Sequence, residues 1–99
     1  MRLLAGLTLA FCAAATQAAD CEQGAEILSQ AQKAYADVVE VGFAWKTTED
    51  YLQDAQKAEM DGDCAALNAH ALRALNTAKA AMEQSRVEQE AWRNRVPKG

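Results

Sequence analysis

The sequence predicts an all-α protein, most simply an antiparallel helical hairpin of two long helices. Its single proline is at position 97, so no proline interrupts a helix in the interior of the chain. Alanine is abundant and β-branched residues are few, which favours helix over sheet. Apolar residues also recur at alternating spacings of three and four along two segments. This spacing is typical of one helix lying along another.

The first residues have the layout of a secretory signal peptide. Met1-Arg2 gives a positively charged start, residues 3–15 form an apolar run, and residues 16–18 supply small side chains around a cleavage site. The apolar run is shorter than the roughly 20 residues that a membrane-spanning helix needs. We therefore expect a signal peptide over residues 1–19, cleavage after Ala18 or Ala19, and a periplasmic location.

The first helix is expected to begin at Asp20 and to end near Met60. Its apolar stripe keeps one phase throughout: Leu28, Ala31, Tyr35, Val38, Gly42, Trp45, Glu49 and Leu52. Gly42 is the weak point, because glycine costs about 1 kcal/mol relative to alanine inside a helix. The constant phase, and the lack of Pro, Asn or Ser beside Gly42, favour a continuous helix. The alternative is a three-helix up-down-up bundle that breaks at Gly42.

Residues 61–63, Asp-Gly-Asp, predict the turn between the helices. Gly62 can adopt the left-handed conformation that closes a helix, and Asp63 can cap the next one. Such a short connection makes the two helices antiparallel neighbours. The second helix is expected from Cys64 to about Arg93, with residues 94–99 as a flexible tail. Its stripe is Cys64, Asn68, Ala71, Leu75, Ala78, Met82, Ser85, Gln89 and Trp92, widened by Leu67, Ala74 and Ala81.

Two cysteines, Cys21 and Cys64, remain after signal removal, and export would expose them to oxidising conditions. A continuous first helix would be about 60 Å long and would hold them at opposite ends, far beyond the roughly 7 Å between Cα atoms that a disulfide allows. A break at Gly42 would bring them to the same end. The periodicity favours the hairpin, while the even number of cysteines favours the bundle. The pair could thus form a disulfide within one chain, link two chains, or stay as thiols.

Composition excludes several classes of function. Removal of Arg2 with the signal leaves 9 basic and 14 acidic side chains, a net charge of −5. This charge argues against nucleic acid or an anionic membrane surface as the main partner. His70 is the one histidine, and no haem-attachment motif, phosphate loop or catalytic triad is present. We therefore expect no enzyme, no metal and no cofactor. Because an alanine-rich core is thin, we expect a protein partner or self-association.

The residues from Gly42 onward resemble the SoxXA-binding protein family. Members share a Gly-x-x-Trp-Arg-x-Thr segment, alanine-spaced turns, a Gly-Asp pair and a second alanine-rich helix. The matching residues here are Gly42, Trp45, Lys46 in place of Arg, Thr48, Leu52, Ala55, Ala58, Gly62-Asp63, Ala71, Ala74 and Gln84. The resemblance covers roughly residues 25–90. Cys64 and Thr77-Ala78 depart from it, where an aromatic residue and Gln-Gly would be expected.

The resemblance implies a periplasmic accessory protein that binds SoxXA, the c-type cytochrome pair that starts thiosulfate oxidation, without carrying haem itself. The expected partner-binding residues are Gly42, Trp45, Lys46, Thr48 and Leu52. Tryptophan is favoured at the centre of protein interfaces, although Trp45 also suits a core anchor. The alternative function is a self-assembling periplasmic coiled coil without a cytochrome partner. A third hypothesis is a thiol carrier based on Cys64.

Overall fold

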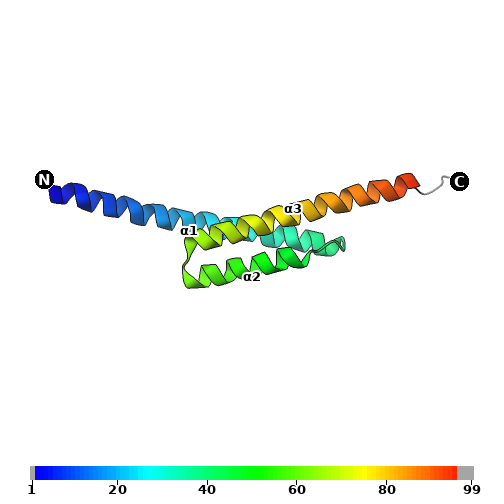
Figure 1. The fold of residues 1–99 in the computed structure, drawn as a ribbon, viewed down its shortest axis with the longest axis horizontal. Coiled ribbons are helices and arrows are strands. Elements are labelled where there is room, and N and C mark those ends of the chain that lie inside the picture. Colours follow the sequence, from blue (N-terminus) through cyan, green and yellow to red (C-terminus); the bar gives the residue numbers. More distant parts are fainter. Residues whose placement is uncertain (1, 96–99) are drawn as a thin grey trace.

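The chain folds into three α-helices and, within residues 2–95, no strand. A computed structural model describes the backbone of residues 2–95 and the side chains of residues 21–95. The helices are α1 (Arg2–Glu40), α2 (Lys46–Asp61) and α3 (Cys64–Arg95) (Figure 1). The expected signal peptide lies outside the part whose side chains are described, and so do tail residues 96–99. Residues 94 and 95, which we assigned to the tail, are helical.

The first long helix of the expected hairpin is broken at Gly42, so the chain adopts the three-helix alternative. Gly42 has φ +79°, in the left-handed region. Its N–H donates to the carbonyl of Val39 at 3.1 Å, and the Phe43 N–H donates to the carbonyl of Val38 at 3.1 Å. This pair of bonds satisfies carbonyls at the end of α1 and closes the helix. A single glycine can end a helix in this way, so the lack of Pro, Asn or Ser beside Gly42 was not evidence for a continuous helix.

The apolar stripe kept its phase across Gly42 although the helix did not. Trp45 is the residue before α2 and has extended backbone angles, φ −99° and ψ 137°. The inward residues of α2, Thr48, Leu52, Ala55 and Ala58, form a face of their own. The stripe therefore combined two separate helical faces that share a spacing by coincidence. Periodicity identified the buried side of each segment and could not detect the reversal between them.

The turn at residues 61–63 is confirmed. Gly62 has φ +73°, and the Asp63 N–H donates to the carbonyl of Ala58 at 3.0 Å. Asp63 then caps α3, because its Oδ1 accepts a hydrogen bond from the Ala66 N–H at 3.1 Å. Both reversals of the chain thus use the same glycine-based helix ending.

The core runs along α3, which packs against both α1 and α2, while α1 and α2 touch each other less. One cluster lies toward the α2–α3 turn and a smaller one lies toward the α1–α2 loop. The buried apolar residues are Leu28, Ala31, Val38, Leu52, Ala55, Ala58, Leu67, Ala71, Ala74, Leu75, Ala78 and Ala81. Seven of these twelve are alanine, so the helices lie close together around little side-chain volume.

Gly24 lies at a close approach of α1 to α3. A Cβ atom at this position would lie 2.8 Å from Cγ of Leu67, which is itself buried. The absence of a side chain therefore allows Leu67 to pack directly against the α1 backbone. The stripe predicted from sequence began at Leu28 and did not include this contact.

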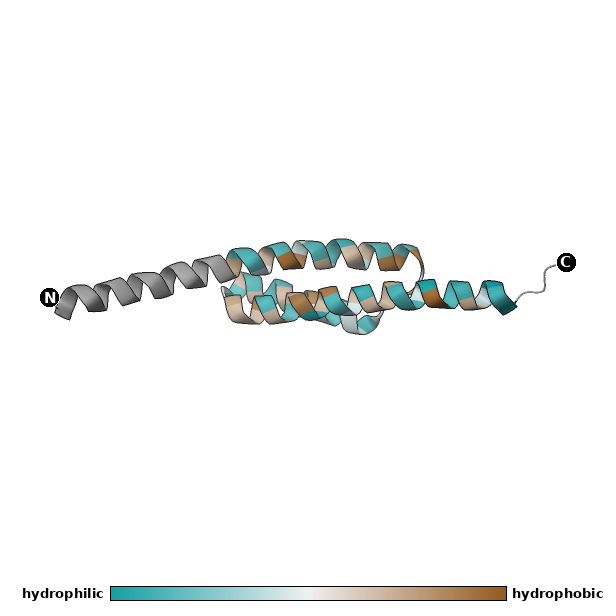
Figure 2. Ribbon diagram, turned by 90° about the horizontal axis from the view of Figure 1, so that it is seen from above, coloured by the Kyte–Doolittle hydropathy of each residue, from teal (hydrophilic) through white to brown (hydrophobic). Residues whose placement is uncertain are grey.

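The molecule is elongated, with principal extents of 84 × 22 × 15 Å. The last part of α3 continues past the loop that joins α1 to α2 (Figure 1). We refer to residues 86–95 as the arm. Its ribbon is mostly hydrophilic, with isolated hydrophobic residues (Figure 2).

Candidate protein-binding surface

Four of the five predicted partner-binding residues lie in the α1–α2 loop or the first turn of α2, whereas Leu52 lies further along α2 in the larger core cluster, and the five differ in accessibility. Gly42 and Lys46 are exposed, and Trp45 is partly buried against the cluster of Val38, Ala78 and Ala81. Thr48 is 1% exposed and Leu52 is 7% exposed. Direct contact with a partner is therefore open to Gly42, Lys46 and the free edge of Trp45. Thr48 and Leu52 instead hold α2 in place.

Thr48 fixes the position of α2 on α3 through a hydrogen bond between side chains. Its Oγ1 donates to Oγ1 of Thr77 at 2.8 Å. The Thr77 hydroxyl lies 2.9 Å from the Arg73 carbonyl and 3.0 Å from the Ala74 carbonyl, so its own hydrogen is directed to the backbone of α3. Because Thr48 is buried, its hydroxyl needs this partner, and the bond specifies one alignment of the two helices.

Lys46 carries a positive charge at the first position of α2. Its Nζ lies 2.6 Å from Oδ1 of Asp50, and this hydrogen bond with the carboxylate raises the pKa of Lys46 above its usual value. Both side chains are more than half exposed, so the pair adds little to stability. The ammonium group therefore remains accessible to a partner.

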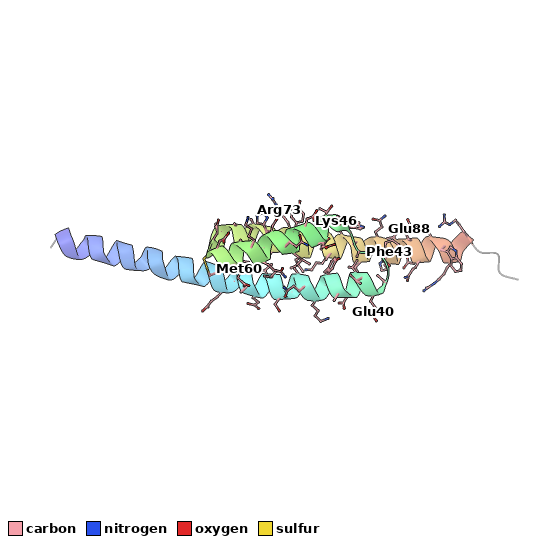
Figure 3. All side chains as sticks on the ribbon, turned by 90° about the horizontal axis from the view of Figure 1, so that it is seen from below. Glu40, Phe43, Lys46, Met60, Arg73 and Glu88 are labelled. Atoms are coloured by element: carbon pink, nitrogen blue, oxygen red, sulfur yellow. A yellow bond between two sulfur atoms is a disulfide. The ribbon has the colours of Figure 1, made fainter. Side chains whose placement is uncertain are left out.

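Apolar side chains gather around the α1–α2 loop without being covered. Val39 is 51% exposed and Val41 is 39% exposed, while Phe43 and Trp45 are partly buried. Figure 3 shows Glu40, Phe43 and Lys46 near this end of the bundle and Met60 near the other end. We call Val39, Val41, Phe43, Trp45 and Lys46 the loop-end surface. Sequence reasoning found Trp45 and Lys46 and missed the other three, although they flank a glycine that we had recognised as a weak point.

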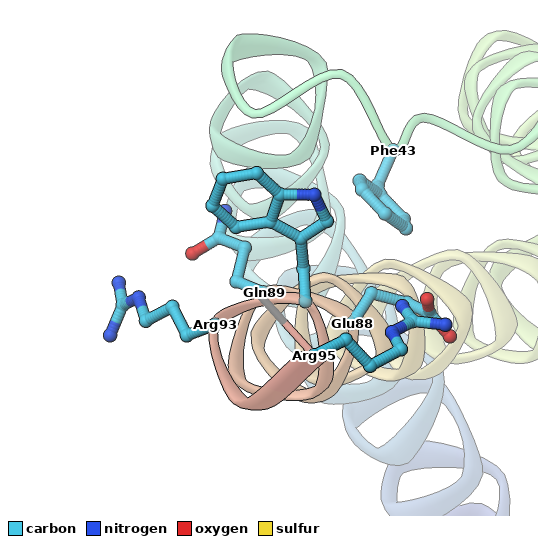
Figure 4. A pocket seen from close by; sticks show the side chains of 6 residues that line it. Phe43, Glu88, Gln89, Arg93 and Arg95 are labelled. Atoms are coloured by element: carbon cyan, nitrogen blue, oxygen red, sulfur yellow. The ribbon is translucent and has the colours of Figure 1, made fainter. Parts of the chain in front are cut away.

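A hollow of about 430 Å³ lies between the loop and the arm. It is lined by Phe43, Glu88, Gln89, Trp92, Arg93 and Arg95 (Figure 4). Trp92 lines this hollow although 63% of it is exposed. The expected antiparallel hairpin of two long helices would place Trp92 near Tyr35. Tyr35 instead packs against the core cluster that contains Leu28 and Leu75.

Cys21 and Cys64 form a disulfide within the chain, with their Cα atoms 4.7 Å apart. The break at Gly42 makes this possible, because α1 starts its packing and α3 begins at the same end of the bundle. The bond ties the first packed turn of α1 to the first turn of α3. In this state Cys64 has no free thiol, which argues against the thiol-carrier hypothesis.

Among residues 21–95, the acidic side chains are spread over all three helices and the one histidine lies on α3. No group of three His, Cys, Asp or Glu side chains in that part is arranged to hold a metal ion. His70 is partly buried, and its Nδ1 has no hydrogen-bond partner there. Within the described residues, no helix is both long enough and apolar enough to span a membrane.

Comparison with protein-family models, with curated proteins and with solved structures found no match. The likeness to the SoxXA-binding family therefore depends on the residue pattern alone. That pattern now has a structural meaning, since its distinctive residues form both helix endings and the start of α2.

Proposed function

We propose that this protein is an exported accessory protein that binds the SoxXA cytochrome through the loop-end surface. The observation that carries the proposal is that Val39 and Val41 are exposed beside Gly42, next to the partly buried rings of Phe43 and Trp45. Exposed apolar patches with a polar rim mark interaction sites on small proteins. Aromatic residues at such sites supply much of the binding free energy.

The family-like residues support this function by building the surface. Gly42 reverses the chain, which places Val41 and Phe43 at the end of the bundle. Trp45 closes the loop against the core, and Thr48 locks α2 onto α3. Residues that resemble a binding motif thus hold the loop in one conformation, which lowers the entropy cost of binding.

Charge supports a partner with a basic face. Residues 20–85 contain 12 acidic and 5 basic side chains, a net charge of −7. An acidic body accelerates association with a basic surface and disfavours acidic partners. Apolar contact at the loop end would then supply most of the affinity.

The test is binding of purified SoxXA to the protein secreted from its full-length precursor. Val41→Asp places a charge in the loop-end surface and should weaken binding at least about tenfold. Leu72→Asp is the matched control, because Leu72 is also exposed and apolar but lies in the first third of α3, away from the loop-end surface. Equal binding by both variants would remove the loop-end surface from the proposal. Absence of binding by the unmodified protein would refute the function.

A second comparison addresses the positive charge in the motif. Lys46→Glu should weaken binding by a few-fold if Lys46 contacts the partner. Lys33→Glu is its control, because Lys33 forms the same kind of exposed pair, with Asp37, on α1. Because added negative charge should favour a basic partner, a similar loss in both variants would contradict the basic face, and equal binding by both would remove Lys46 from the contact.

A further inference from the structure

The arm presents the inner stripe of α3 where no helix of the bundle covers it. Ser85 is 2% exposed and is the last buried residue of the stripe. Gln89 and Trp92 continue the stripe at spacings of four and three, and both are exposed. Because α1 ends at Glu40 and α2 begins at Lys46, the bundle stops near Ser85 (Figure 1). Trp92 is therefore an inward-facing residue that lacks a neighbouring helix.

In the arm, the acidic residues Glu88 and Glu90 come before the basic residues Arg93 and Arg95 along the helix. Arg86 is neutralised within α3, because its guanidinium lies 2.6 Å from both Glu83 and Glu90. These contacts lower the pKa of Glu83 and raise that of Arg86. Glu88, Arg93 and Arg95 take part in no ion pair within residues 21–95. Three charges thus remain available, one acidic and two basic.

A second copy of the arm, packed antiparallel, would cover the exposed stripe and would also pair these charges. Glu88 and Arg95 are seven residues apart, so they lie along the same edge of the stripe. A two-fold axis between Gln89 and Trp92 would set Trp92 of each copy beside Gln89 of the other. The same axis would bring Glu88 of each copy next to Arg95 of the other. Opposed helix dipoles also favour this direction.

We propose that the arm binds a second copy of this chain in an antiparallel, two-fold-symmetric pair. Trp92 of each copy enters the hollow beside Phe43 of the other, and two Glu88–Arg95 pairs flank the contact. The interface is isologous and closed, so it gives a dimer rather than a filament. Ten residues per copy is well below the roughly 20–30 of a standard interface. We therefore expect a dissociation constant on the order of 0.1 mM.

Sedimentation equilibrium of the secreted protein, up to about ten times that concentration, tests the pair. Glu88→Arg and Arg95→Glu should each weaken the dimer about tenfold, because each sets like charges together twice. An equimolar mixture of the two variants should restore the affinity, since in the mixed pair both arginines of one copy face the two glutamates of the other. Glu26→Arg and Lys79→Glu are exposed charge reversals outside the arm and should have no effect.

Three results would overturn the proposal. The unmodified protein could remain monomeric at every concentration tested, as it would if only a cytochrome bound the arm. The arm variants could dimerise as well as their controls, or their mixture could fail to recover. Circular dichroism of each variant verifies that the arm is still helical. The SoxXA proposal is assessed separately, because Val41 and Leu72 are unchanged in these variants.

Discussion

Loss of the Cys21–Cys64 disulfide should remove much of the stability of this protein. The bond links residues 43 positions apart. The loop-entropy relation gives about 4 kcal/mol of stabilisation for a loop of this length. A domain of about 80 residues has a total stability of roughly 4–12 kcal/mol. The reduced protein should therefore retain a free energy of unfolding of only roughly 0–8 kcal/mol.

The composition of the core explains why one bond has such a large effect. Within residues 21–95, seven of the twelve buried apolar residues are alanines, which bury little side-chain area. The ion pairs within residues 21–95 all lie within single helices and are exposed, so they do not join the helices. The contact between α1 and α3 therefore consists of the disulfide and a thin layer of apolar packing.

Urea unfolding followed by far-ultraviolet circular dichroism measures the effect. The double variant Cys21→Ser, Cys64→Ser should unfold at a midpoint lower by about 2 M than the oxidised protein, for a denaturant slope near 2 kcal/mol per M. Reduction of the unmodified protein should give the same midpoint, while a reductant should leave the double variant unchanged. A loss below about 1 kcal/mol would refute the reasoning, because alanine packing alone would then hold the bundle.

Three further substitutions test other parts of the fold by the same measurement. Gly42→Ala should destabilise by about 1–2 kcal/mol, because Gly42 has positive φ; stabilisation would instead indicate a continuous helix. Thr77→Val should lower the free energy of unfolding by about 1–3 kcal/mol, because it leaves the Thr48 hydroxyl unpaired. Thr48→Val should lower it less, because Thr77 retains its backbone partners. Equal losses would contradict the roles of Thr48 as donor to Thr77 and of Thr77 as donor to the backbone. Gly24→Ala should destabilise by about 1 kcal/mol, because overpacking against Leu67 exceeds the gain in helix propensity; a more stable variant would show that Leu67 can move aside.

Part of the proposed binding surface could be predicted from the sequence. Trp45 and Lys46 were identified through the resemblance of the segment from Gly42 to Thr48 to the SoxXA-binding family. Thr48 and Leu52 were assigned to the same surface by the same resemblance, and helical spacing alone does not tell a core face from a binding face. Val41 and Phe43 could be found only once the reversal at Gly42 was known, because that reversal moves them to the end of the bundle.

The sequence by itself determined the helical class, the buried faces and the turn at Gly62-Asp63. These features follow from local spacing and from single residues, such as the Asp63 side chain that caps α3. Only the tertiary structure decided the number of helices, the pairing of Cys21 with Cys64 and the exposure of Trp92. The reason is that Gly42 can continue or end a helix at similar local cost. Contacts between residues distant in the chain select between these outcomes.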